Sequence, residues 1–322
     1  MEIIAMAIPR NFGIRVLETT STSWISPSKF TWNPSRKRGM IKMAQTEASP
    51  DVIKELSLST GTYLIPHPKK VETGGEDAFF VGGCNGSVVA IADGVSGWAE
   101  RNVNPALFSR ELMRNVSLVI EEEQANFDPV ILLKKAHSST TSMGSATVII
   151  AMLERNGVLK IASVGDCGLR VIRAGQLVFT TTPREHYFDC PFQVSSEANG
   201  QTYRDATVCS VQLMEGDAII LGSDGLFDNA FDREIVSTIS DIKDAAEAAK
   251  LVANLAHNHS KDVNFDSPYT QEARTMGYDV PDWKKMIGKK LKGGKLDDIT
   301  VIVGIVSANS RSSSDNTLKL DT

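Results

Sequence analysis

The chain has 322 residues, of which 42% are hydrophobic and 23% charged, and its formal net charge is −5 at pH 7. This length can bury one large core or two small ones, and the acidic balance does not favour nucleic acid or an anionic membrane as partner of the whole chain. No apolar run approaches the roughly 20 residues that span a bilayer. The four cysteines include no C-x-x-C pair, which argues against a zinc finger and a dense disulfide framework.

Residues 1–50 differ in composition from the rest of the chain. Up to Thr46, seven basic residues face only Glu2 and Glu18, and nine serines or threonines lie between Thr19 and Ser35. A stretch that is rich in serine and basic residues, poor in acids and without an apolar central block is typical of an organelle transit peptide. An ordinary disordered tail is the alternative reading. Loss of this leader would leave a body with a net charge of about −10.

From about residue 57 the chain alternates short β-branched runs with turn signals. Strands are expected at 78–83, 87–93, 145–153, 158–166, 169–175, 176–181, 206–213, 217–224 and 299–306. The pairs Asn156-Gly157 and Ala174-Gly175 indicate antiparallel hairpins. Helical periodicity covers 105–123, 129–140 and 244–258. Because strands far outnumber helices, the sequence predicts an α+β fold in which stacked sheets are flanked by helices.

Residues 260–294 interrupt this pattern before the last strand. The segment is polar, is punctuated by Gly and Pro, and has a lysine-rich C-terminal half. We expect an irregular, flap-like insertion beside the site, with cations that raise the encounter rate with acidic protein substrates. These cations are Lys284, Lys285, Lys289, Lys290 and Lys292. A solvated, lysine-rich loop is the alternative. The globular domain is expected at 58–307, with a disordered, serine-rich tail at 308–322.

Acidic residues gather at the ends of the expected strands, beside glycine or other small residues. They are Glu76, Asp77, Asp93, Asp166, Asp224, Asp228, Asp297 and Asp298. Taken singly, an Asp-Gly pair after a strand is more often a turn than a site. Taken together, carboxylates without nearby cations repel one another, and Mg²⁺ or Mn²⁺ relieves this repulsion through oxygen ligands. The joint pattern predicts a divalent-metal site.

Six segments in a specific order carry a resemblance to a known family. They are GGEDAFFV, IADGVSGW, GSATVIIAML, SVGDCGLRVIRAG, GSDGLFD and KLDDITVIV. Together they resemble the metal-dependent protein phosphatases, the 2C type of serine/threonine phosphatase, over roughly residues 58–307. The resemblance implies a β-sandwich of two antiparallel sheets flanked by pairs of helices, with two or three Mn²⁺ or Mg²⁺ ions in a cleft at one end.

The family's metal ligands can be carried over to matching positions of this sequence. The resemblance implies that Asp93 bridges two metals, that Gly94 binds through its carbonyl, and that Asp224 and Asp297 hold the first metal. It also implies that Glu76 holds the second metal, directly or through a water molecule. A hydroxide shared by the two metals would then attack phosphorus in line, so no side-chain nucleophile is needed.

Three further aspartates match family positions with other roles. Asp77 would orient a metal-bound water, which makes it, with Asp93, a catalytic candidate. Asp166 and Asp228 match positions that hold a third metal in some members. The implied substrates are proteins that carry phosphoserine or phosphothreonine.

The proton donor to the leaving group departs from the family pattern. Many members have a histidine two residues after the bridging aspartate, where this chain has Val95. A metal-bound water, His67 and His186 are the remaining candidates. For either histidine, an ordinary loop or packing role is the alternative.

The phosphate-binding position and the last metal position also depart from the pattern. Glu72 stands where many members have a phosphate-binding arginine, and Lys69 or Lys70 could bind phosphate in its place as a point charge. In the final Asp-Asp pair, Asp298 replaces an asparagine, which leaves open which aspartate binds metal. The register favours Asp297.

Two segments, ADGVSGW and EHYFDCPFQ, resemble a branch with organelle-targeted members, including chloroplast enzymes of photosystem II core proteins. With the leader, they predict a monomeric phosphatase of the chloroplast stroma that acts on thylakoid phosphoproteins, some of them membrane-embedded, without nucleic-acid partners. A mitochondrial location is the alternative. A phosphate-sensing or scaffold member of the same fold, or a hydrolase of small phosphate esters, is the alternative function.

Overall fold

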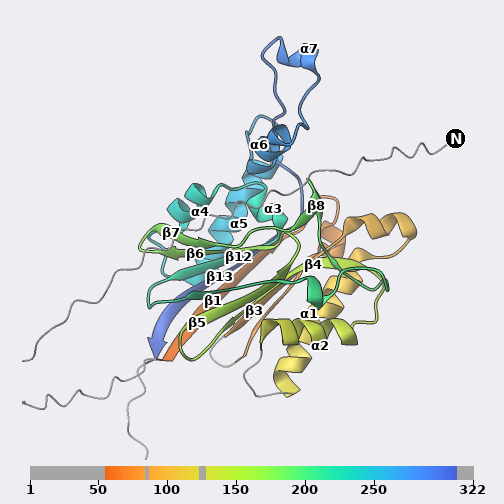
Figure 1. Cartoon of the computed structure of the whole chain (residues 1–322). Coiled ribbons are helices and arrows are strands. Elements are labelled where there is room, and N and C mark those ends of the chain that lie inside the picture. The colour runs from red at the N-terminus through yellow and green to blue at the C-terminus, as the bar shows by residue number, and fades with distance from the viewer. Residues whose placement is uncertain (1–54, 84–86, 123–127, 310–322) are drawn as a thin grey trace, which may run out of the picture. The chain divides into compact units, whose positions relative to one another are not determined.

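The computed structural model describes residues 55–83, 87–122 and 128–309 (Figure 1). The predicted leader and the residues after 309 lie outside this part of the chain. The first strand begins at Glu55 and the last ends at Asn309, so regular structure extends slightly beyond the expected 58–307.

Two antiparallel sheets form the centre of the fold. The five-stranded sheet has the order β1-β13-β12-β6-β7, formed by Glu55–Ile65, Ile299–Asn309, Ala218–Gly222, Gly168–Arg173 and Gln176–Thr180. The six-stranded sheet has the order β11-β5-β4-β3-β2, formed by Thr207–Gln212, Val158–Val164, Ser145–Leu153, Val88–Gly94 and Ala78–Gly82, and β10 (Val194–Ser195) pairs with β4. A separate hairpin joins β8 (Glu185–Tyr187) and β9 (Cys190–Pro191).

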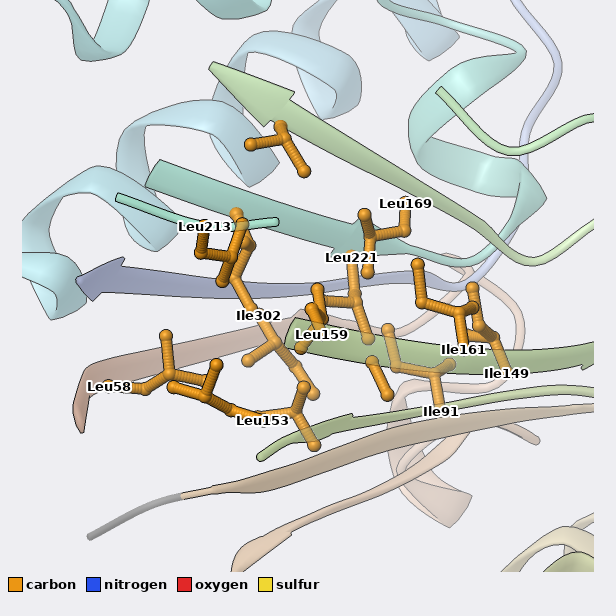
Figure 2. Close-up of a cluster of buried hydrophobic side chains, with 14 of the residues drawn as sticks. Leu58, Ile91, Ile149, Leu153, Leu159, Ile161, Leu169, Leu213, Leu221 and Ile302 are labelled. Atoms are coloured by element: carbon orange, nitrogen blue, oxygen red, sulfur yellow. The ribbon is translucent and has the colours of Figure 1, made fainter. Parts of the chain in front are cut away.

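The inner faces of the sheets share one apolar core (Figure 2). It takes alternate side chains from both sheets, such as Ile91 and Ile149 from one and Leu221 and Ile302 from the other. The remaining side chains of the central strands face helices, which explains why β4 is buried along its whole length and reads as continuously apolar. Each fully buried leucine or isoleucine stabilises the fold by about 1.5–3 kcal/mol.

Helices cover both outer faces. On the six-stranded sheet lie α1 (Pro105–Glu122) and α2 (Pro129–Ser139), and on the five-stranded sheet α4 (Asp232–Ile239) and α5 (Ala245–Lys261). The shorter helices are α3 (Asp224–Phe227), α6 (Pro268–Thr275) and α7 (Asp282–Lys285). Among the described residues, the 3₁₀ helices are η1 (Val71–Thr73), η3 (Ser96–Arg101) and η4 (Tyr203–Asp205).

The observed layers confirm the predicted α+β sandwich, with local differences. The expected hairpin turns are present, and Gly157 takes a φ of +82° that its turn requires. β1 and α4 were not expected, and the 260–294 segment is less irregular than expected because it contains α6 and α7. Within the described residues no helix is long and apolar enough to cross a membrane.

Candidate metal centre and active site

The predicted metal ligands come from one end of the sandwich. At this end of the sandwich, β2 begins next to the end of β3, because the two strands pair antiparallel. In the other sheet, β12 ends here and its antiparallel partner β13 begins here. The acidic residues lie just before β2, at the end of β3, between β5 and β6, at both ends of α3 and before β13. In the same order they are Glu76-Asp77, Asp93, Asp166, Asp224 and Asp228, and Asp297.

Three glycines allow the loops at this end to approach each other closely. A Cβ on Gly94 would lie 2.7 Å from the Glu76 carbonyl oxygen, and a Cβ on Gly225 would lie 2.1 Å from the Asp298 carbonyl oxygen. Gly75 has a φ of +81°, and its Cβ would lie 2.7 Å from Asp298 Oδ1. The close backbone contacts that bring the carboxylates together therefore require glycine at these positions.

Asp298 holds the loop that carries Glu76. Its carboxylate is buried and accepts hydrogen bonds from the backbone N–H of His67 (2.6 Å) and of Glu76 (2.8 Å). Because these donors occupy both oxygens, Asp298 positions the loop, whereas Asp297 accepts only one backbone hydrogen bond, at Oδ1 from the N–H of Asp298 (2.9 Å).

Lys295 lies among the carboxylates of the predicted first and third metal sites. Its Nζ is 2.6 Å from Asp224 Oδ2, 2.8 Å from Asp228 Oδ2 and 3.8 Å from Asp297 Oδ2. Burial would raise the pKa of Asp224, but the Lys295 ammonium outweighs this effect and holds that pKa below its usual value. Burial and the charge of Asp224 raise the pKa of Asp297 to about 7.

Lys70 has the same relation to the predicted second metal site. Its Nζ is 2.7 Å from Glu76 Oε2, 3.2 Å from Asp298 Oδ2 and 3.0 Å from the hydroxyl of Ser96. Burial would lower the pKa of Lys70, but the hydrogen bond to Glu76 and the charges of Asp298 and Glu76 outweigh it and raise that pKa. A cation therefore already balances the acidic residues at this edge of the cluster.

The centre of the cluster retains excess negative charge. The Oδ1 atoms of Asp77, Asp166 and Asp224 are buried and have no hydrogen-bond partner among the described residues. Burial, and then the charge of Asp298, raise the pKa of Asp77 to about 7, and burial with four neighbouring aspartates raises the pKa of Asp93 well above its usual range. Buried acceptors without donors are costly unless a cation binds them.

This arrangement fits divalent metal ions. In the described part of the chain no three acidic, histidine or cysteine side chains already enclose a site. However, the unpartnered oxygens, the raised carboxyl pKa values and the all-oxygen donor set are what a hard cation such as Mg²⁺ or Mn²⁺ would satisfy.

Of the residues predicted to bind substrate phosphate, only one lies next to the acidic cluster. Lys70 lies in the cluster, whereas Lys69 is exposed and its backbone N–H donates to His67 Nδ1. Lys290 forms an ion pair with Asp266 rather than with a carboxylate of the cluster. Glu72 is exposed in η1.

His186 lines a polar cavity of about 470 Å³ next to the end of β3. Val95, the residue that follows Gly94, lines the same cavity. The His186 ring stacks on Phe192 at 4.1 Å, and its Nε2 lies 3.2 Å from the side-chain nitrogen of Gln201. His186 therefore lines the same cavity as Val95, the position at which many family members carry a histidine.

Several residues of the site were not identified from the sequence. Thr300 donates its hydroxyl to Asp77 Oδ2 at 2.6 Å, and Arg110 holds the loop before Glu76 through the carbonyls of Thr73 (2.7 Å) and Gly75 (2.9 Å). Lys295, which follows the 260–294 segment directly, was not singled out from the sequence. Its position two residues before Asp297 was the available signal, but nothing in the sequence shows the direction of its side chain.

A second cavity of about 230 Å³ adjoins the cluster on the side of the 260–294 segment. Asp166, Asp224 and Asp228 line it together with Tyr269 and Glu272 of α6. The Tyr269 hydroxyl donates to Asp189 at 3.1 Å, so α6 is joined to the β8–β9 hairpin at the edge of the site. The inserted segment thus forms one wall of this cavity.

Comparison with known proteins identifies relatives among metal-dependent phosphatases. A scan against models of protein families finds no match. The chain is 68% identical over 254 residues to protein phosphatase 2C 1 of Oryza sativa subsp. japonica, which covers 79% of this chain and 77% of that protein. It is 57% identical over 274 residues to protein phosphatase 2C 26 of Arabidopsis thaliana, which covers 85% of this chain and 92% of that protein.

Solved structures also resemble the chain. The X-ray structure of the photosystem II phosphatase PBCP is 67% identical, has a TM-score of 0.75, and covers 77% of this chain and 98% of that one. The catalytic domain of the serine/threonine protein phosphatase PstP, solved with two manganese ions, is 17% identical, with a TM-score of 0.54 and coverage of 78% and 99%. At that identity the second likeness shows the fold alone.

Proposed function

The chain belongs to the protein phosphatase 2C family of metal-dependent serine/threonine phosphatases, and we propose that it dephosphorylates photosystem II core proteins in the chloroplast. The observation that carries the catalytic part is the convergence of six aspartates, three of them with buried oxygens that lack donors. The substrate is supported by the 67% identity to the photosystem II phosphatase. The location is supported by the acid-poor composition of residues 1–50.

We assign the ligands of two Mn²⁺ or Mg²⁺ ions as follows. Asp93 would bind both ions and the Gly94 carbonyl would be a further ligand. Asp224 and Asp297 would hold the first ion, and Glu76 would hold the second, directly or through water. The free oxygen of Asp224 and the commitment of Asp298 to backbone donors support this choice.

Asp166 and Asp228 are assigned to a third ion. Both line the 230 Å³ cavity beside the cluster, and burial with neighbouring aspartate charges raises both pKa values, that of Asp228 to about 7. A metal ion at this position would neutralise the carboxylate charge of Asp166 and Asp228, which Lys295 balances only in part.

The protein's own groups position the reactants. When bound, the metal ions supply positive charge to the phosphoryl oxygens and lower the pKa of water toward neutrality. Thr300 fixes one oxygen of Asp77, so the other oxygen is directed to hold an attacking water by a hydrogen bond. The Lys70 ammonium, at the edge of the cluster, can attract a substrate phosphate.

His186 is our candidate for the group that donates a proton to the leaving serine or threonine oxygen. It lines the cavity that Val95 opens onto, whereas the Nδ1 of His67 already accepts a hydrogen bond from Lys69. A water in the same cavity is the alternative donor.

The test of catalysis uses phosphoserine, phosphothreonine and phosphotyrosine peptides with and without Mn²⁺ or Mg²⁺. We expect metal-dependent release of phosphate from the first two. Asp93→Asn or Asp224→Asn should lower kcat/KM by at least about a hundredfold, since each removes a carboxylate that would hold the metal ions whose positive charge stabilises the transition state. Asp241→Asn, on an exposed turn after α4, is the matched control. Undiminished turnover in excess chelator would rule out the mechanism.

The test of the substrate is separate. Thylakoid membranes with phosphorylated photosystem II core proteins should lose phosphate faster than a soluble phosphoprotein at equal phosphate concentration. Equal rates on both would leave the phosphatase assignment intact and remove the photosystem II assignment.

A further inference from the structure

The tip of the 260–294 segment exposes three large apolar side chains. Trp283 is 62%, Met286 87% and Ile287 63% exposed. Figure 1 shows α7, which contains Trp283, at the far end of the segment beyond α6 and away from both sheets. In the described part of the chain, none of the three apolar cores includes these side chains.

The base of this tip is well defined. One oxygen of Asp279, Oδ1, accepts hydrogen bonds from the backbone N–H of Val280 (2.7 Å) and of Leu291 (2.8 Å), which closes the loop between them. The Tyr278 ring stacks on Phe188 of the β8–β9 hairpin with centroids 5.3 Å apart. The apolar residues are therefore presented at the end of a closed loop, where exposure of this kind indicates a binding surface.

Lysines surround the apolar side chains. Residues 282–292 contain five lysines and a single acid, Asp282, although the whole chain has a net charge of −5. Lys285 and Lys290 form ion pairs with Asp279 and Asp266, whereas Lys284, Lys289 and Lys292 form none with another described residue. The tip is thus locally cationic, opposite in sign to the chain as a whole.

We propose that this tip docks onto an anionic lipid bilayer. Tryptophan and aliphatic side chains flanked by lysines are suited to the boundary between lipid headgroups and acyl chains, and each lysine near an anionic surface adds favourable electrostatic energy. A soluble protein partner would need a pocket shaped for Trp283, Met286 and Ile287, whereas a bilayer accepts them without a matched shape. Lysines alone would suffice to attract an acidic protein, so the apolar side chains favour lipid.

The experiment measures co-sedimentation of the full chain with vesicles of neutral phosphatidylcholine and with vesicles that contain anionic phosphatidylglycerol. We expect binding to the anionic vesicles only. Replacement of Trp283, Met286 and Ile287 by serine should weaken binding to these vesicles at least about tenfold. Replacement of Lys284, Lys289 and Lys292 by glutamine should weaken it to a similar extent. The matched control is a variant with serine in place of Leu118, Met143 and Val208, which are exposed apolar residues outside the 260–294 segment. This variant should bind like the unchanged protein.

Two further readouts separate this proposal from others. Quenching by brominated lipid should fall in Trp283→Phe, because Trp283 would be the inserted fluorophore among four tryptophans. Turnover of a soluble phosphopeptide should be unchanged in the apolar triple variant, so failure of docking is distinguishable from failure of catalysis.

Three outcomes would overturn the proposal. The first is no binding to anionic vesicles, and the second is equal binding by the apolar variant. The third is sedimentation of the vesicle-free protein as a dimer that the apolar variant abolishes, because the tip would then be an interface between two copies of this chain.

Discussion

Lys295 and Lys70 place two ammonium groups among carboxylates that a divalent-metal site also needs. Carboxylates could be located from the sequence because each follows or precedes an apolar strand, and the ends of antiparallel strands meet. The lysine positions could not, because a long side chain can reach either solvent or the cluster from the same backbone. The 2.6 Å contact between Lys295 and Asp224 depends on the tertiary structure, because the chain before β13 runs beside α3.

We predict opposite effects of Lys295→Met on stability and on metal affinity. Without metal, the variant should unfold more easily, by about 3 kcal/mol, because buried carboxylates of Asp224 and Asp228 lose their counter-ion. With Mn²⁺ this deficit should shrink, and the dissociation constant for Mn²⁺ should fall because no ammonium competes for the same oxygens. Thermal melting and titration calorimetry measure the two effects.

Lys261→Met, at the exposed end of α5, is the control for loss of one positive charge. Weaker Mn²⁺ binding by Lys295→Met would show that the lysine organises the ligands instead of competing with the metal.

Among the secondary-structure elements, those with strong internal patterns were predicted and those defined by partners were not. α1, α2 and α5 have clear periodicity, and α5 also has an N-cap in Asp244, which accepts from the N–H of Glu247 at 2.8 Å. β1 lacks a clear pattern because Ser, Thr and Gly fill its centre. Its register with β13 extends over its whole length, and Gly61 allows close contact with α5.

Glu111 on α1 joins this helix to the turn before β4. Its carboxylate accepts from the N–H of Ser142 (2.7 Å) and from the N–H (3.1 Å) and hydroxyl (2.9 Å) of Thr141, and hydrogen bonding from Ser142 and Thr141 lowers its pKa to about 2. We predict that Glu111→Gln lowers the free energy of unfolding by about 1 kcal/mol at pH 7, a value reduced for the partial exposure of this site.

This difference should depend on pH in a defined direction. The unfolded chain binds a proton at Glu111 near a pKa of about 4.3, and the folded chain only near 2. The stabilising contribution is therefore complete above about pH 5 and is lost as the pH falls toward 2. Urea unfolding of both proteins at pH 7, 5 and 3.5 measures it. Glu122→Gln, at the exposed end of α1, should show little change, and a pH-independent deficit for Glu111→Gln would contradict the electrostatic explanation.

At the scale of the whole molecule, the order of motifs predicted the sandwich and the gathering of acidic residues at one end of it. The form of the 260–294 segment was not predictable, because its helices are short and depend on contacts such as the ion pair of Arg274 with Asp266 (2.7 Å). The exposed apolar tip was also not predictable, since a sequence does not show whether Trp283, Met286 and Ile287 are exposed or belong to a core. Their exposure becomes evident only once the three cores are complete without them.

The leader proposed for residues 1–50 gives a last prediction, which concerns how the mature chain begins. A fluorescent fusion of residues 1–57 should enter an organelle, the chloroplast by our proposal, because acid-poor, serine-rich basic segments are typical import signals. Processing must leave β1 whole, since all eleven of its residues pair with β13. We therefore expect mass spectrometry to place the mature N-terminus before Glu55.

A chain that begins at Val52 should keep the melting temperature of the processed protein, whereas one that begins at Thr62 should not fold stably, because β13 would lose most of its partner strand. Diffuse cytosolic fluorescence would refute import, and a mature chain that starts inside β1 would refute the structural limit on processing.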